Sequence, residues 1–241
     1  MLTQRARLAQ HGTAPGRPTN PHLRDTDMEP NFWHERWARR EIAFHEGEAN
    51  AGLVAHLGAL GLAPGAGILV PLCGKTRDIA WLLDHGHRVA GVELSPVAIG
   101  ELFAELNITP TLTEESPLTH YRADNLDIWV GDLFDLTAER LGEVDAIYDR
   151  AALVALPETL RGRYAAHLMA LTRTAPQLLM TYEYDQLAHD GPPFSVQEGE
   201  VRDRYEGAYH LKLLSRQAVE GGLKGKTASA SAAWLLRPRH P

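Results

Sequence analysis

The sequence predicts an α/β fold with one mostly parallel sheet of seven strands and helices on both faces. Short apolar runs alternate along the chain with segments of helical periodicity, which is typical of repeated strand–helix–strand units. The clearest unit lies in 67–95, and parallel strands need such a helical crossover. We place its elements as follows: strand 68–70, turn 71–74, helix 75–85 with Gly86 as its stop, and strand 88–92 ending on Glu93.

The composition indicates a globular protein without a nucleic-acid or membrane partner. With 241 residues, the chain is long enough for one large α/β domain. Its net charge of −7 argues against a general attraction to phosphate backbones. Cys73 is the only cysteine, which excludes an intramolecular disulfide and favours the cytoplasm. No apolar run reaches the length of a membrane span or forms a signal peptide, and nothing favours an oligomer over a monomer.

The amino-terminal residues differ from the rest of the chain. Residues 1–27 contain few large apolar side chains, three prolines and four arginines. We therefore expect a disordered extension there and a single domain over 28–241. Met28 is a candidate for the natural first residue, because patterned sequence begins at that point.

The other elements follow from periodicity and from capping residues. Trp33 and Trp37 share one face of the first helix, which either docks on the domain or covers a ligand as a lid. Ser95 suits the N-cap of the helix after Glu93. We expect helices at 29–43, 50–60, 96–106, 136–141, 157–171 and 196–205, an irregular stretch at 107–119, strands at 126–130, 144–148 and 177–184, a loop at 189–195, and a last antiparallel pair of strands at 209–215 and 228–237.

Polar side chains follow four of the predicted parallel strands. They lie in the turn 72–74 and at Glu93, Asp132, Asp149 and Arg150. Because the carboxyl ends of parallel strands meet at one edge, these groups should line one rim, where such sheets bind ligands.

Glu93 suits the two hydroxyls of an adenosine ribose, and it follows Gly74 by about 20 residues, the offset typical of this role. The turn lacks the glycine-rich pattern of a pyrophosphate site, and Pro71 has no N–H to donate. S-adenosylmethionine therefore fits best, while a dehydrogenase-like cofactor and a non-nucleotide ligand stay open as alternatives.

Each of these residues also has a purely structural interpretation. In that interpretation, Glu93 is an ordinary surface carboxylate at a strand end, and Asp132 is a turn former. Asp149 and Arg150 would then form a structural ion pair, and Cys73 would be a small buried side chain rather than a nucleophile. The sequence has no HExxH motif, no paired cysteines and no tight carboxylate cluster, so we expect no metal site.

A set of motifs in one order resembles the thiopurine S-methyltransferase family, especially its bacterial form. The resemblance covers nearly all of 29–237 and depends on these segments: FWHERW with IAFH, VPLCGK, HRVAGVELS, GDLF, YDRAALVAL and DGPPF. It implies a class I, Rossmann-like, S-adenosylmethionine-dependent methyltransferase. It also implies methyl transfer to the sulfur of aromatic or heterocyclic thiols, or to selenium or tellurium compounds, with S-adenosylhomocysteine as product.

The resemblance also implies roles for individual residues. Arg150 would lie near the reacting end of the cofactor and the substrate, and Asp149 is a candidate proton acceptor. Phe44 and Phe194 would contact the substrate. The implied cofactor contacts are Trp33, Trp37, Leu72, Glu93, Asp132, Leu133 and Arg150.

Two other functions stay open. One is another small-molecule methyltransferase acting on thiols or halides. The other is a metalloid-detoxifying protein that binds S-adenosylmethionine without turnover. A nucleic-acid methyltransferase is disfavoured, because Gly191 in GPPF offers no side-chain acceptor for a base amine.

Overall fold

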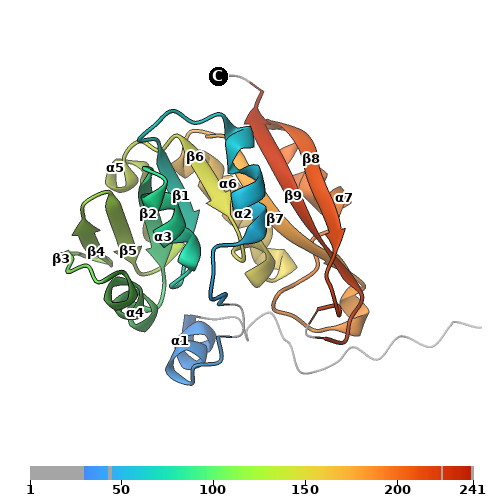
Figure 1. Ribbon diagram of the computed structural model, residues 1–241, viewed down its shortest axis with the longest axis horizontal. Helices are drawn as coiled ribbons and strands as arrows, with labels where there is room; N and C mark the ends of the chain where they lie inside the picture. The colour runs from blue at the N-terminus through green and yellow to red at the C-terminus, as the bar shows by residue number, and fades with distance from the viewer. Residues whose placement is uncertain (1–29, 43–44, 224, 240–241) are drawn as a thin grey trace, which may run out of the picture.

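The computed structural model describes residues 30–42, 45–223 and 225–239, which form a nine-stranded sheet (Figure 1). The strand order is β3-β4-β5-β2-β1-β6-β7-β9-β8, and the five central strands, β5 to β7, run parallel. The strands are β1 (Gly67–Pro71), β2 (Arg88–Glu93), β3 (Thr111–Glu115), β4 (Leu118–Ala123), β5 (Leu126–Val130), β6 (Ala146–Asp149), β7 (Gln177–Tyr184), β8 (Tyr209–Ala218) and β9 (Ser229–Pro238).

The predicted count of seven strands is wrong. The stretch 107–119, which the sequence presented as irregular, begins an antiparallel hairpin, and its strands β3 and β4 extend the sheet beyond β5. Most side chains of β3 are polar and exposed, so the alternation of apolar and polar residues that marks a half-buried strand is missing. The predicted antiparallel pair at the other edge is confirmed as β8 and β9, both longer than expected.

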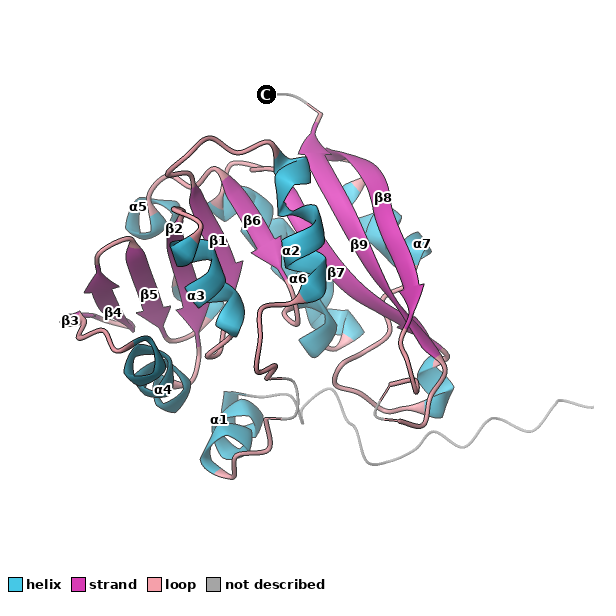
Figure 2. Cartoon of the chain, viewed as in Figure 1, coloured by secondary structure: helices cyan, strands magenta, loops and turns pink. Residues whose placement is uncertain are grey.

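Helices cover both faces of the sheet, as predicted (Figure 2). Ser95 caps the helix after β2, because its hydroxyl accepts the N–H of Ala98 at 3.3 Å. The α-helices are α1 (Pro30–Ala38), α2 (Ala51–His56), α3 (Arg77–Asp84), α4 (Pro96–Leu106), α5 (Ala138–Leu141), α6 (Glu158–Leu171) and α7 (Glu198–Tyr205), and the 3-10 turns are η1 (Leu57–Leu60), η2 (Leu133–Asp135), η3 (Leu153–Ala155) and η4 (Gln186–Ala188).

Alternation along the central strands divides the core into two layers. On β1, Ile68 and Val70 pack with α2, α3 and α4, whereas Leu69 packs with α6 and α7. The other central strands alternate in the same way, because successive side chains of a strand point to opposite faces. Burial on both faces explains why these strands read as short, continuous apolar runs.

Two predictions fall on residues outside the described ranges. These are the disordered extension at 1–27 and the substrate contact of Phe44. Among the described residues, none of the helices combines the length and apolar character that crossing a membrane requires.

Candidate functional site

A cavity of about 640 Å³ opens at the carboxyl ends of the central parallel strands. Two groups of lining residues come from the strands on the two sides of β1, or from the turns after them: β2 and β5 on one side, β6 and β7 on the other. We call them the β2 side, with Glu93, Asp132 and Leu133, and the β6 side, with Tyr148, Arg150 and Tyr182. Since β2 and β6 are two strand spacings apart, the backbones of the two sides lie about 10 Å apart. The rest of the lining comes mainly from the α1 helix, residues 45–46, the first turn, η2, η3 and the loop near 192, together with Asp78 of α3, Leu160 and Tyr164 of α6, and Leu223.

Glu93 is the buried carboxylate of the β2 side. Its two oxygens accept the backbone N–H groups of Gly74 and Ser95, each at 2.9 Å. Burial raises the pKa of this carboxyl, and the two N–H groups oppose the rise. Each oxygen keeps a lone pair for a ligand, so the predicted contact with two hydroxyls is chemically available.

The first turn brings the backbone close to an aromatic ring. Gly74 has φ of +51°, and a Cβ at this position would lie 3.0 Å from a ring carbon of buried Trp37. Leu72, which lines the cavity, also has a positive φ, of +47°, where a branched side chain is strained. Such strain is typical of turns that position a ligand.

Cys73 borders the cavity, but its side chain is buried in the packed core. Its sulfur fills space that a Cβ at Gly91 would occupy, at 3.0 Å from that position. Burial and the negative charge of Glu93 raise the pKa of its thiol well above the usual value. The thiol therefore stays protonated and inert at neutral pH, as its interpretation as a small buried side chain requires.

Asp132 lines the cavity and forms a turn at the same time. Its carboxylate accepts the N–H of Phe134 at 2.9 Å and caps η2. This places the buried side chain of Leu133 and the ring of Phe134 in the lining. The turn interpretation and the ligand interpretation of Asp132 are thus compatible.

Arg150 dominates the β6 side. Its side chain is only 10% exposed and forms an ion pair with Glu46, which is 44% exposed. Burial lowers the pKa of Arg150, but the charges of Glu46 and Asp78 outweigh burial and raise it. Asp78 itself is buried and accepts the phenol of Tyr148 at 3.1 Å.

Asp149, the neighbour of Arg150, is not part of the cavity lining. Its fully buried carboxylate accepts the phenol of Tyr164 at 2.8 Å and the N–H of Leu153 at 3.1 Å. Burial raises its pKa from 3.8 to about 6. The end of β6 therefore directs Arg150 into the cavity and Asp149 into the core, which favours a supporting role for the aspartate.

The loop at 189–195 contributes its prolines to the site. Pro192 and Pro193 line the cavity, whereas Phe194 is absent from the lining and packs 5.6 Å from the guanidinium of Arg161. A Cβ at Gly191, whose φ is +83°, would lie 2.5 Å from the Phe194 ring, so this close packing needs glycine.

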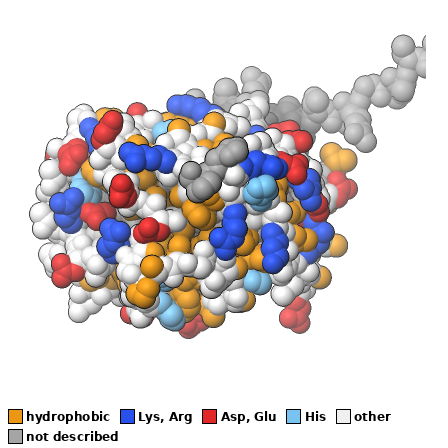
Figure 3. Space-filling view, turned by 90° about the horizontal axis from the view of Figure 1, so that it is seen from above, with side chains coloured by type: hydrophobic (Ala, Val, Ile, Leu, Met, Phe, Trp, Pro, Cys, Tyr) orange, Lys and Arg blue, Asp and Glu red, His pale blue; other side chains and the backbone are white. Residues whose placement is uncertain are grey.

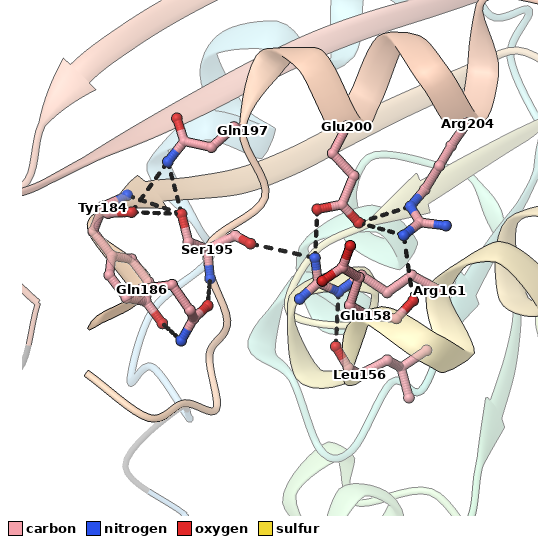
Figure 4. Close-up of polar contacts among 9 residues, drawn as sticks. All are labelled: Leu156, Glu158, Arg161, Tyr184, Gln186, Ser195, Gln197, Glu200 and Arg204. Atoms are coloured by element: carbon pink, nitrogen blue, oxygen red, sulfur yellow. Dashed lines mark hydrogen bonds and ion pairs between the residues drawn. The ribbon is translucent and has the colours of Figure 1, made fainter. Parts of the chain in front are cut away.

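Arg161 holds this loop from the α6 helix (Figure 4). Its buried side chain donates to the carbonyls of Leu156 at 2.8 Å and Ser195 at 3.3 Å, and it pairs with Glu200 at 2.6 Å. Ser195 is held further by Tyr184 and Gln186 on the other side of the loop. One arginine therefore ties together η3, the loop and α7.

Pattern reasoning missed several lining residues of the β6 side. Asp78 and Tyr148 belong to a helix and a strand that were predicted, but nothing in their spacing shows that they meet. His45, also in the lining, has its pKa lowered by burial and by Lys75, so its ring is neutral at neutral pH. A polar residue within an apolar strand, such as Tyr148 in AIYD, was the one usable signal.

Comparison with known proteins identifies the family. The thiopurine S-methyltransferase family model matches residues 28–234. The chain belongs to the thiopurine S-methyltransferase family. It is 56% identical to a thiopurine S-methyltransferase of Xanthobacter autotrophicus over 87% of this chain and 99% of the relative. It is 51% identical to one of Teredinibacter turnerae over 87% and 97%. The resemblance stated from the motifs is confirmed.

Solved structures confirm the predicted methyltransferase fold. The Burkholderia thailandensis 1,6-didemethyltoxoflavin-N1-methyltransferase, solved with S-adenosylhomocysteine, aligns with a TM-score of 0.60 at 18% identity over 93% of both chains. The Synechocystis magnesium protoporphyrin IX methyltransferase with bound S-adenosylmethionine aligns with a TM-score of 0.57 at 17% identity, over 91% of this chain and 100% of the other.

The lining of the cavity fits S-adenosylmethionine. Glu93 offers free lone pairs to two ribose hydroxyls, and Leu133 with Phe134 offers an apolar surface to the adenine. In α1, Trp33, Trp37 and Arg36 also line the cavity, and Arg36 Nε is buried with no hydrogen-bond partner among the described residues. A buried donor of this kind calls for an acceptor, which a ligand carboxylate supplies. Within the same residues, no group of three or more potential ligands is arranged to hold a metal ion.

Proposed function

We propose that the chain transfers a methyl group from S-adenosylmethionine to the sulfur of aromatic or heterocyclic thiols such as thiopurines. One observation carries the proposal: a single cavity joins the buried carboxylate of Glu93 to the buried guanidinium of Arg150 through a mostly apolar wall. Such a wall suits a planar ring, and the names of the relatives point to the same acceptors.

When bound, S-adenosylmethionine supplies a methyl group on a sulfonium that is already activated for transfer. The protein must therefore hold the acceptor sulfur in line, and such positioning contributes up to roughly 7–11 kcal/mol to a rate enhancement. The apolar lining excludes water from the reacting atoms. Arg150 favours the thiolate over the thiol, because the guanidinium attracts the negative charge that appears when the proton leaves.

Two acceptors for the thiol proton can be distinguished. His45 lines the cavity with a neutral ring, so it is in the form that accepts a proton. Asp149 accepts three hydrogen bonds inside the core, from Leu153, Tyr164 and Gln177, and it is absent from the cavity lining. We assign Asp149 to support of the β6 end and Arg150 to the stabilisation of the anion.

Selenium and tellurium compounds belong to the same proposal as alternative acceptors. They would react through the same in-line displacement, and the lining distinguishes them from thiols only by size. We place the chain in the cytoplasm as a monomer without nucleic-acid or membrane partners. The net charge of −7 and the interspersed charges of both signs on the face in Figure 3 support this assignment.

An assay with S-adenosylmethionine and 6-mercaptopurine tests the proposal. The wild-type protein should form S-adenosylhomocysteine and the S-methylated purine in equal amounts. Arg150→Ala should lower turnover at least about tenfold, equivalent to roughly 1.4 kcal/mol of transition-state stabilisation, while circular dichroism shows an intact fold. A wild-type protein that methylates none of 6-mercaptopurine, thiophenol and selenol donors would contradict the proposal. Binding of cofactor without product would support the non-catalytic alternative.

A further inference from the structure

Two carboxylates of the lining interact with Arg150. The guanidinium of Arg150 pairs with Glu46, and Asp78 acts on it as well. One cation therefore faces two carboxylates on the β6 side. The positive charge of Arg150 is thus shared with two carboxylates before a ligand enters, so a second anionic group on the ligand would compete with Glu46 for the guanidinium.

Asp78 is fixed in the fold. One of its oxygens accepts the backbone N–H of Asn50 at 2.7 Å, and the other accepts the phenol of Tyr148 at 3.1 Å. The side chain is buried at the start of α3. Because both oxygens have hydrogen-bond partners in the fold, the carboxylate of Asp78 stays in place beside Arg150.

Glu46 is held differently, where the cavity meets solvent. Besides Arg150, its carboxylate has Asn50 as a partner, whose side-chain amide donates to it at 3.1 Å. Asn50 is itself fixed as the N-cap of α2, since its side-chain oxygen accepts the N–H of Gly52 at 2.9 Å. Two anchored groups thus hold a half-exposed carboxylate over Arg150.

We propose that Glu46 is a specificity-determining residue that excludes thiols carrying a permanent carboxylate and so restricts the β6 side to acceptors without one. The inference rests on the proposed function, because it concerns the acceptor of that reaction. A carboxylate on the acceptor ring would have to displace Glu46 from Arg150 or lie beside it. Repulsion between unit charges at about 4 Å in a half-exposed site corresponds to roughly tenfold in affinity.

Two thiols that differ by one carboxylate test this inference on the full chain. The quantity is the ratio of kcat/KM for 2-mercaptobenzoate to that for thiophenol. Glu46→Gln keeps the shape and removes the charge, so the ratio should rise about tenfold. Glu48→Gln removes an equal charge from an exposed position on the same loop outside the lining, and it should leave the ratio within twofold of the wild type.

Two further variants separate charge from structure. Glu46→Asp keeps the charge and should keep the low ratio, whereas Glu46→Ala should raise it as Gln does. A ratio that stays within twofold of the wild type in both Glu46→Gln and Glu46→Ala would overturn the inference. So would a rise that also occurs in Glu48→Gln.

A binding measurement distinguishes failure of this inference from failure of the proposed function. Calorimetry with 2-mercaptobenzoate in the presence of S-adenosylhomocysteine gives the same comparison without turnover. Tighter binding by Glu46→Gln than by the wild type, with no methyl transfer to thiophenol by either protein, would contradict the proposed reaction and support the charge selection. Equal binding would overturn the charge selection even if thiophenol is methylated normally.

Discussion

The two sides of the cavity are built by different means. On the β2 side, Glu93 is held by backbone N–H groups of the neighbouring turn and of Ser95, all within a single strand–helix–strand unit. On the β6 side, Arg150 is held by side chains from distant parts of the chain, among them Glu46. The backbone therefore fixes the side that we propose for the cofactor, while side-chain pairs fix the side that we propose for the acceptor. Substitutions on the β6 side should alter the acceptor site without altering the cofactor site.

The largest expected effect comes from Arg161→Ala, in the residue that holds the loop at 189–195 beside the cavity. The change leaves Glu200 without one of its two arginine partners and two carbonyls without donors in a buried place. Removing one partner of a buried ion pair costs about 3–5 kcal/mol. Urea unfolding should show a loss of this size, together with a raised KM for the thiol.

Arg202→Ala is the matched control for this prediction. Arg202 lies on α7, the helix that also carries Glu200, and it pairs with Glu198 and Glu206 on an exposed face. Exposed pairs of this kind contribute about 0–1 kcal/mol. If the two variants lost similar stability, the special role of Arg161 in holding the loop would be refuted.

On the β2 side, Glu93→Ala should weaken the binding of S-adenosylhomocysteine by about 1–3 kcal/mol, because charged hydrogen bonds to a ligand are lost. Calorimetry measures this affinity. The KM for the thiol should stay within about twofold of the wild-type value, because the backbones of β2 and β6 lie about 10 Å apart. An affinity equal to that of the wild type would remove Glu93 from the cofactor site.

The same division explains what the sequence could and could not predict. The motif from the first turn to Glu93 is local, so spacing along the chain was enough to place its carboxylate at the cavity. Glu46 and Arg150 form an ion pair although they lie far apart in the sequence, and no periodic pattern of residues predicts such a pair. The β3–β4 hairpin was missed for a related reason, because an exposed edge strand has no apolar pattern.

The roles of Phe194 and Asp149 show a second limit of pattern reasoning. Both residues adjoin lining residues, Pro193 and Arg150, but Phe194 packs against Arg161 and Asp149 accepts hydrogen bonds in the core. A motif therefore identifies the segment that reaches the cavity more reliably than the side chain that enters it.

A smaller effect should appear in the pH dependence of stability. Burial raises the pKa of Asp149 from 3.8, the ordinary value that applies in the unfolded chain, to about 6 in the folded protein. At pH 5 the carboxyl of the folded protein therefore holds a proton that the carboxyl of the unfolded chain has lost. This stabilisation is complete below the ordinary pKa and is lost as the pH rises through 6. Between pH 7 and pH 5, the unfolding free energy of the wild type should rise by about 1 kcal/mol relative to that of Asp149→Asn.

Urea unfolding at pH 5, 6 and 7 measures this difference between the two proteins. An identical pH dependence would show that Asp149 does not titrate as its burial requires. Turnover separates the two roles of the residue. If Asp149 only supports the fold, Asp149→Asn should leave the pH profile of methyl transfer unchanged. If the variant loses the acidic or alkaline limb of that profile, Asp149 is the proton acceptor.

The smallest effect on stability should come from Asn50→Asp, which removes the side-chain donor to Glu46 and leaves the backbone N–H that Asp78 accepts. Asp and Asn are equally good N-caps, so α2 keeps its cap and the unfolding free energy should change by less than about 0.5 kcal/mol. The new charge faces Glu46 in place of an amide donor and loosens its hold over Arg150. The kcat/KM for thiophenol should shift about two- to fivefold at low salt and return toward the wild-type value at high salt, where exposed charges are screened. The affinity for S-adenosylhomocysteine should not change, and a parallel loss of cofactor affinity would show that the two sides of the cavity are coupled after all.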